Sequence, residues 1–115
     1  MELSIENVLN IGADEFYRTD RYKLPLAVIL INTKDIKAFD ILDSCTRQTD
    51  IVQQLNADLL VVFLVHTTYE DALLFINKIN DKLSFTYTLE EYKQSHLEFV
   101  KDMFKQNIKN NNLSF

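Results

Sequence analysis

The sequence predicts an α+β fold in which helices cover a four-stranded, mostly antiparallel sheet. Runs with strand character alternate with stretches of helical periodicity, in the order α-β-α-β-β-α-β-α. The chain has one Gly and one Pro among 115 residues, so regular elements should fill most of it. Apolar residues make up 47% and charged residues 25%, which suits a single domain over residues 1–115. The inner β-α-β-β-α-β order is the ferredoxin-like arrangement, with a helix added at each end.

The first helix is predicted to run from a cap at Ser4 to about Arg21. Apolar positions from Ile5 to Phe16 recur at helical spacing, and serine is a favoured N-cap residue. Together with the last helix of the chain, this helix should cover an edge of the sheet or the face that the core helices leave free.

The first strand is predicted at Leu26–Ile31, directly after Pro25. Proline is tolerated at the start of a strand, where its missing N–H does little harm. The run "LAVILI" is continuously apolar, which is typical of a strand that is central or covered on both faces. The next helix is predicted over residues 35–46. Its inward stripe consists of Ile36, Phe39, Leu42 and Cys45.

A β-hairpin is predicted next, with strands over residues 50–55 and 58–65. Asn56 and Ala57 lie between them as the turn. Asparagine tolerates the positive φ that tight hairpin turns require, and alanine suits the second position less well than glycine.

The last third of the chain is predicted to form a helix, a strand and a helix. The helix "TTYEDALLFINKINDKL" is capped by Thr67 or Thr68. The strand "SFTYTL" is rich in β-branched and aromatic residues. The final helix covers Leu97 to Lys109. Its apolar face consists of Val100, Met103, Phe104 and Ile108.

Composition narrows the classes of function. The net charge of −5 argues against nonspecific nucleic-acid binding, which needs a basic face. A single cysteine, Cys45, excludes an internal disulfide and suits a reducing compartment; on a helical pattern it is expected to be a small core residue. The N-terminus lacks the basic residues of a signal peptide, and the longest apolar run, Leu59–Val65, is too short to span a bilayer. We therefore expect a cytoplasmic protein without membrane contact.

Several polar groups have plain structural interpretations. His66 and His96 fit no metal-ligand spacing, so no metal is expected. Glu90 and Glu91 are expected in a solvated loop. Three lysines spaced four apart form a basic stripe on the last helix, either a solvated face or a contact for an acidic partner. These are Lys101, Lys105 and Lys109. Four tyrosines form either a contact patch or part of the core. These are Tyr17, Tyr22, Tyr87 and Tyr92.

Three segments together resemble the GGDEF family, whose diguanylate cyclase domains condense two GTP into cyclic dimeric GMP. "RTDRYKLPLAVILIN" is similar to the family's arginine-bearing helix end and first strand. "RQTDIVQQLNADLLVVFLVHTTYEDALLFINKI" is similar to its hairpin and following helix. "FKQNIKNNN" is similar to the end of its last helix. The resemblance covers most of the chain.

The signature of the family is degenerate in this chain. Active members carry Gly-Gly-acid-acid-Phe at the hairpin turn. Those positions hold Asn56, Ala57, Asp58, Leu59 and Leu60. The aspartate that ends the first strand and binds metal is matched by Asn32, a poor Mg²⁺ ligand. One remaining acid is too few for the metals that phosphoryl transfer needs.

Two further departures concern GTP recognition. The segment that carries the family's guanine-recognising side chains is mostly missing between residues 36 and 47. The phosphate-gripping lysine of the last helix is matched by Asn107. The resemblance therefore implies no catalytic residues, no bound cofactor and no diguanylate cyclase activity.

One motif of the family is retained. Arg47 and Asp50 match the Arg-x-x-Asp product site that precedes the catalytic hairpin in many members. An arginine can grip phosphate or guanine edges, and a carboxylate can accept from guanine N–H groups. The same two residues also suit a structural role, with Arg47 at a helix end and Asp50 at the start of a strand.

Four hypotheses follow from the sequence. The first is an inactive GGDEF-like regulatory or interaction domain in bacterial signalling, acting through a partner protein or a homodimer. The second is a cyclic dimeric GMP receptor that uses Arg47 and Asp50. The third is residual activity on a nucleotide, and the fourth is a ferredoxin-like fold without any relation to the family.

Overall fold

The computed structural model describes residues 2–112 and confirms the predicted fold class. Five helices and four strands are described within this range. In chain order they are α1 (Glu2–Ile11), α2 (Ala13–Tyr22), β1 (Leu26–Asn32), α3 (Ala38–Cys45), β2 (Ile51–Asn56), β3 (Leu59–Val65), α4 (Tyr69–Asn80), β4 (Thr86–Glu91) and α5 (His96–Asn112).

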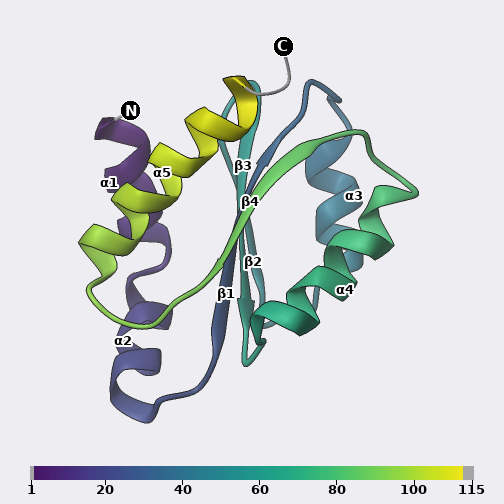
Figure 1. The fold of residues 1–115 in the computed structure, drawn as a ribbon. Coiled ribbons are helices and arrows are strands. Elements are labelled where there is room, and N and C mark those ends of the chain that lie inside the picture. The colour runs from purple at the N-terminus through teal and green to yellow at the C-terminus, as the bar shows by residue number, and fades with distance from the viewer. Residues whose placement is uncertain (1, 113–115) are drawn as a thin grey trace.

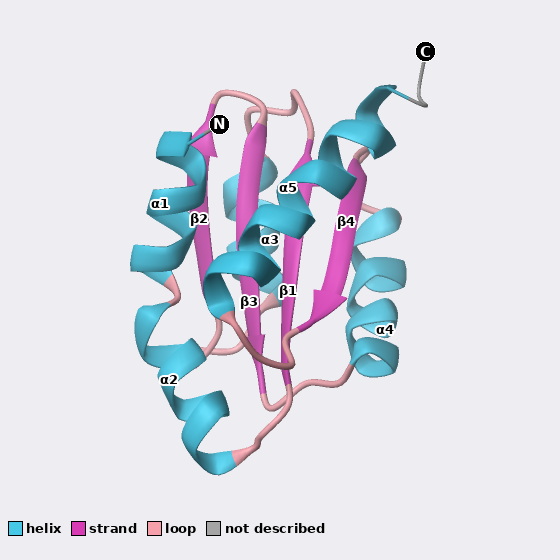
Figure 2. Ribbon diagram, turned by 60° about the vertical axis from the view of Figure 1, so that its left-hand side comes forward, coloured by secondary structure: helices cyan, strands magenta, loops and turns pink. Residues whose placement is uncertain are grey.

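The four strands form one antiparallel sheet in the order β2-β3-β1-β4 (Figure 2). The continuously apolar strand β1 lies between β3 and β4, so its predicted central place is confirmed. Figure 1 shows α3 and α4 on one face of the sheet and α1, α2 and α5 on the other. The added terminal helices thus cover the face that a bare ferredoxin-like core would leave open.

The two faces carry separate cores because successive residues of a strand point to opposite sides. Odd-numbered residues of β1 join the α3/α4 core, and even-numbered residues join the α5 core. In β3 this order is reversed: Leu60, Val62 and Leu64 belong to the α3/α4 core, while Val61 and Phe63 belong to the α5 core. Both central strands are therefore buried on both faces.

The first predicted helix is in fact two helices that meet at Gly12. The Gly12 N–H donates to the Val8 carbonyl and the Phe16 N–H donates to the Gly12 carbonyl, so helical hydrogen bonds continue across the break. A Cβ at Gly12 would lie 2.4 Å from two ring atoms of Phe63. The absence of a side chain lets this point of the chain rest on that ring. The prediction of a cap at Ser4 is wrong, because Ser4 lies within α1.

The second predicted helix begins three residues later than expected. The Asp35 carboxylate accepts the Lys37 N–H at 2.8 Å, and this local turn replaces the first helical turn. The predicted inward stripe is wrong at two positions, because Ile36 is 96% exposed and Phe39 is 37% exposed. Ala38 and Leu42 are the fully buried residues of α3.

Three smaller details concern the C-terminal half. Thr68 is the cap of α4, with its Oγ1 accepting the Asp71 N–H. Glu90 and Glu91 lie in β4 rather than in a loop, and the Glu91 carboxylate accepts the Tyr69 N–H at the start of α4. Ile108 is exposed, and Asn107 takes the buried position beside it on α5. Within residues 2–112 no helix has the length and apolar character needed to cross a bilayer.

Candidate functional site

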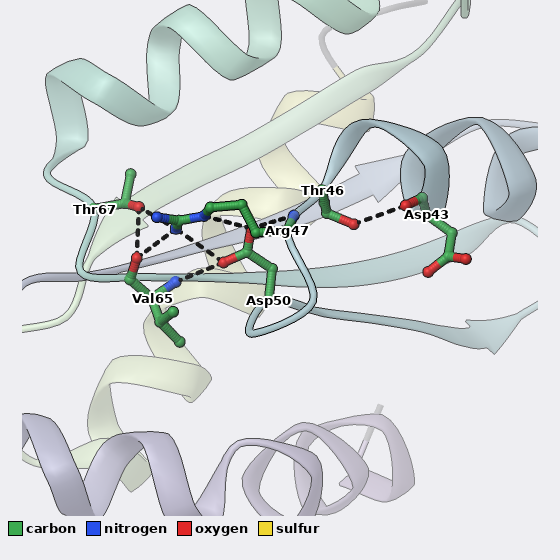
Figure 3. Close-up of polar contacts among 6 residues, drawn as sticks. All are labelled: Asp43, Thr46, Arg47, Asp50, Val65 and Thr67. Carbon is green, nitrogen blue, oxygen red and sulfur yellow. Dashed lines mark hydrogen bonds and ion pairs between the residues drawn. The ribbon is translucent and has the colours of Figure 1, made fainter.

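Arg47 and Asp50 form a closed set of hydrogen bonds at the end of β3 (Figure 3). Arg47 Nε donates to Asp50 Oδ2 at 3.1 Å, and Nη2 donates to Asp50 Oδ1 at 2.9 Å. Nη2 also donates to the Val65 carbonyl and to Thr67 Oγ1. The segment between α3 and β2 is thereby tied to the residues that leave β3. We call Arg47, Asp50, Val65 and Thr67 the clasp.

The Asp50 carboxylate is fully used inside the clasp. Besides the guanidinium, its Oδ1 accepts the Val65 N–H at 3.1 Å and its Oδ2 accepts the Arg47 N–H at 2.9 Å. Four donors fill the acceptor positions of a carboxylate, and the Asp50 side chain is only 2% exposed. In this arrangement Asp50 has no acceptor position left for a ligand N–H group.

Arg47 is the outward half of the clasp. Its side chain is 56% exposed, and the hydrogen bond to Asp50 raises the pKa of its guanidinium further above the ordinary value. The arginine is therefore charged at neutral pH. Sequence reasoning found Arg47 and Asp50 by their spacing but missed Val65 and Thr67, which follow 18 and 20 residues after Arg47.

A groove of about 370 Å³ lies beside the clasp, between α4 and the end of α3. Cys45 lines the α3 side as a partly buried free thiol, which accepts from Lys82 Nζ at 3.7 Å. The predicted small core residue is therefore at the border of the core. The lining residues from α4 are Asp71, Leu74, Phe75 and Lys78.

The hairpin tip differs from the predicted turn by one residue. β2 continues through Asn56, which pairs with Leu59, so the turn consists of Ala57 and Asp58. The Asn56 side-chain oxygen accepts the Asp58 N–H at 2.9 Å, and none of these residues has a positive φ. A register shift between Gln54 and Asn56 makes this geometry possible. A positive φ at Asn56 is therefore not part of this turn.

The signature positions after the turn face the core. Leu59 is 6% exposed and belongs to the α5 core, and Leu60 is 1% exposed and belongs to the α3/α4 core. Asp58 is exposed, and its carbonyl accepts the Thr33 N–H at 3.0 Å. The tip thus presents one carboxylate to solvent.

Asn32 ends β1 opposite Leu59 of β3 and Thr86 of β4. Its side-chain oxygen is buried and has no hydrogen-bond partner within residues 2–112. Burying such a group unsatisfied costs about 1–3 kcal/mol. The residue that matches the metal-binding aspartate is therefore a neutral amide, closed in between two neighbouring strands.

Asn107 lies in a polar network between α5 and β4. It is 5% exposed, and its Oδ1 accepts from Thr88 Oγ1 at 3.1 Å. Asn110 Nδ2 donates to the same hydroxyl at 2.9 Å and to the Tyr87 carbonyl at 3.2 Å. These contacts anchor the end of α5 on the edge strand. The sequence signal that marks them is a pair of asparagines three apart on one helix side.

The remaining candidates are two histidines, four tyrosines and the lysines of α5. His66 and His96 are exposed, and the His96 ring stacks on Phe16 with centroids 5.9 Å apart. Tyr92 is buried and donates from its hydroxyl to Asp20 at 2.8 Å, whereas the other three tyrosines of the predicted patch are exposed. The three lysines of α5 are exposed. Over residues 2–112, no three His, Cys, Asp or Glu side chains gather as a metal site would require.

Comparison with known proteins identifies the fold. No protein-family model matches the chain, and no curated protein matches it. Seven chains of solved structures match, among them a structure described as a DGC protein from Thermotoga maritima. The two chains are 16% identical with a TM-score of 0.64, and the match covers 91% of this chain and 92% of the other. This protein therefore shares the fold of that DGC protein over nearly its whole length.

Proposed function

We propose that this chain is a degenerate GGDEF-like domain that acts in bacterial signalling through protein contacts and does not make cyclic dimeric GMP. DGC abbreviates diguanylate cyclase, so the shared fold supports the family resemblance carried by the sequence. The proposal treats residues 1–115 as one domain. It places the protein in the cytoplasm, where the free thiol of Cys45 would stay reduced.

The burial of Leu59 is the observation that best supports the proposed loss of catalysis. In active members of the family an acid occupies this place. Here the side chain is part of the α5 core, 6% exposed, directly opposite Asn32 on β1. Two of the expected metal ligands are thus replaced by a core leucine and a partly buried neutral amide. Asp58 alone would offer a divalent cation one carboxylate.

The test is a GTP turnover assay on the purified chain with Mg²⁺ or Mn²⁺. We expect no cyclic dinucleotide, because the metals that neutralise charge in phosphoryl transfer would lack their ligands. A cyclic product that disappears in Asp58→Asn, but persists in the matched exposed variant Asp81→Asn, would refute the loss of catalysis.

A second candidate function is a cyclic dimeric GMP receptor. The exposed guanidinium of Arg47 beside the groove favours it, since arginine binds phosphate and guanine edges in a bidentate manner. The four donors on Asp50 oppose it, because guanine N–H groups would have to displace bonds that hold the clasp. Protein contact is therefore the function that the geometry supports better.

Calorimetric titration with cyclic dimeric GMP separates the two candidates. We expect no binding heat up to about 500 µM ligand, the range of weak association. Saturable binding that is lost in Arg47→Lys would instead establish the receptor, since lysine keeps the charge and loses the fork. Binding that survives this substitution would exclude Arg47 as the contact.

A further inference from the structure

One face of α4 lines the groove beside the clasp and has an apolar centre. Asp71, Leu74, Phe75 and Lys78 follow each other at i, i+3, i+4 and i+7, so they lie on one side of the helix. All four line the same groove. Leu74 is 66% exposed, and Phe75 is partly buried against the α3/α4 core. We call these four residues the α4 stripe.

The α4 stripe is complementary to itself when it is reversed. It reads acid, apolar, apolar, base along the chain. If a second α4 stripe lies antiparallel about a two-fold axis between Leu74 and Phe75, each Asp71 faces a Lys78 and each Leu74 faces a Phe75. A two-fold interface needs this property, because every contact between two positions occurs twice.

Both charges of the α4 stripe are available for such a contact. Ion pairs among residues 2–112 join Arg18 to Glu15, Arg47 to Asp50 and Lys93 to Glu91, so they leave Asp71 and Lys78 aside. The other charged pair along the groove is the clasp, whose two charges neutralise each other. His66 is the remaining titratable side chain at that end, and Lys82 lies near Cys45 at the α3 side.

We propose that the α4 stripe is a homodimer interface in which two copies pack antiparallel through α4. This inference rests on the proposed interaction function and deepens it by naming a second copy of the chain as a partner. Leu74, at the centre of the α4 stripe, is 66% exposed, so this side of α4 is accessible along the groove. An apolar centre with opposite charges at its two ends fits a reversed copy of itself.

The expected dimer is weak. Two 12-residue helices in contact bury less surface than the roughly 1,200 Å² of a stable complex. We therefore expect a dissociation constant of about 10 µM to 1 mM. The constant should rise with ionic strength, because salt screens the paired charges at the edge of the contact.

Sedimentation equilibrium of the full chain over this concentration range tests the interface. Asp71→Lys and Lys78→Asp should each raise the dissociation constant about tenfold or more, because like charges then face across the axis. The double variant carries both exchanges in each copy and restores opposite charges. Its dissociation constant should return to within about threefold of the original.

Matched controls separate the contact from general charge effects. Glu70→Lys makes the same change as Asp71→Lys in the same helical turn, but its side chain does not line the groove. Lys101→Asp makes the same change as Lys78→Asp on the exposed side of α5. Both controls should leave the dissociation constant unchanged. Circular dichroism establishes that every variant is folded.

Three results would overturn this interface. One is a chain that stays monomeric at about 1 mM, which would leave α4 to other proteins. The second is a dimer that Leu74→Glu does not weaken. The third is a folded double variant that fails to regain association. Sedimentation measures association and is independent of catalysis. A monomeric chain would therefore refute the interface but not the proposed loss of GTP turnover. A dimer that turns over GTP would refute the loss of catalysis but not the interface.

Discussion

At the scale of single residues, the Asp50 carboxylate is the most constrained group of the site. It is almost fully buried, and its four donors come from two residues, Arg47 and Val65. A buried carboxylate is tolerated only while its hydrogen-bond partners remain. If a partner is removed, the desolvation cost of the buried charge is no longer compensated. The primary role of the clasp is therefore structural.

Arg47→Ala should lower the free energy of unfolding by about 1–3 kcal/mol, since Asp50 then stays buried with half of its donors gone. Urea denaturation measures this loss. Arg18→Ala is the matched control, because Arg18 is as exposed as Arg47 and pairs with Glu15 at the same spacing, whereas the Glu15 side chain is less buried than that of Asp50. That variant should lose less than about 0.5 kcal/mol. Equal losses in both variants would contradict a structural clasp.

Tyr92 gives the clearest pH dependence. Burial, and then the hydrogen bond to Asp20, raise the pKa of its hydroxyl to about 12. A group whose folded pKa exceeds its unfolded value stabilises the fold below the unfolded pKa, near 10 for tyrosine. That contribution is lost as the pH rises from about 10 to about 12.

Absorbance titration of the phenols checks this expectation. One phenol should ionise as a separate late step, near pH 12 or at alkaline unfolding. Tyr92→Phe should remove that late step and leave the others in place. A late step that persists in Tyr92→Phe would assign it to another residue.

For single residues, the sequence predicts which side chains are suitably spaced but not which distant residues they contact. The Arg-x-x-Asp spacing was visible, whereas Val65 and Thr67 meet Arg47 only because β2 and β3 pair in one register. The unsatisfied oxygen of Asn32 was equally out of reach, since it depends on what β3 and β4 place around it. Long-range pairing decides such contacts, and a local pattern does not contain it.

At the scale of elements, the period of the apolar residues predicted every strand and nearly every helix. Two of the errors fall at element ends, where single polar side chains decide. Asp35 accepts the Lys37 N–H and delays α3, and Asn56 accepts the Asp58 N–H and moves the turn. Such local bonds compete with helix and strand formation. The apolar period does not predict the division between α1 and α2, because it continues through Gly12.

Gly12→Ala should destabilise the fold by about 1–3 kcal/mol, because its Cβ would overlap the buried Phe63 ring. The gain in helix propensity, about 1 kcal/mol, offsets only part of this cost. Thermal denaturation measures the change. In a Phe63→Leu background the same substitution should cost less, since the two ring atoms are gone. An equal cost in both backgrounds would place the strain elsewhere.

At the scale of the whole molecule, two cores share one sheet. The side chains of β1 and β3 point alternately into the α3/α4 core and the α5 core. If either strand unfolds, both cores therefore lose packing contacts. The terminal helices are therefore part of the folding unit, although a ferredoxin-like core has no need of them. This sharing was predictable from the continuous apolar runs of both strands.

Unfolding should therefore be a single cooperative transition. Ile76→Val in the α3/α4 core should cost about 0.5–1.5 kcal/mol, and Val100→Ala in the α5 core about 0.5–3 kcal/mol. Each should lower the same calorimetric transition, with equal calorimetric and van't Hoff enthalpies. Lys101→Ala, exposed on α5, is the control and should leave the transition in place. Because both cores share the two central strands, they should unfold together. Two transitions, each shifted by only one of the core variants, would show instead that the two layers fold independently.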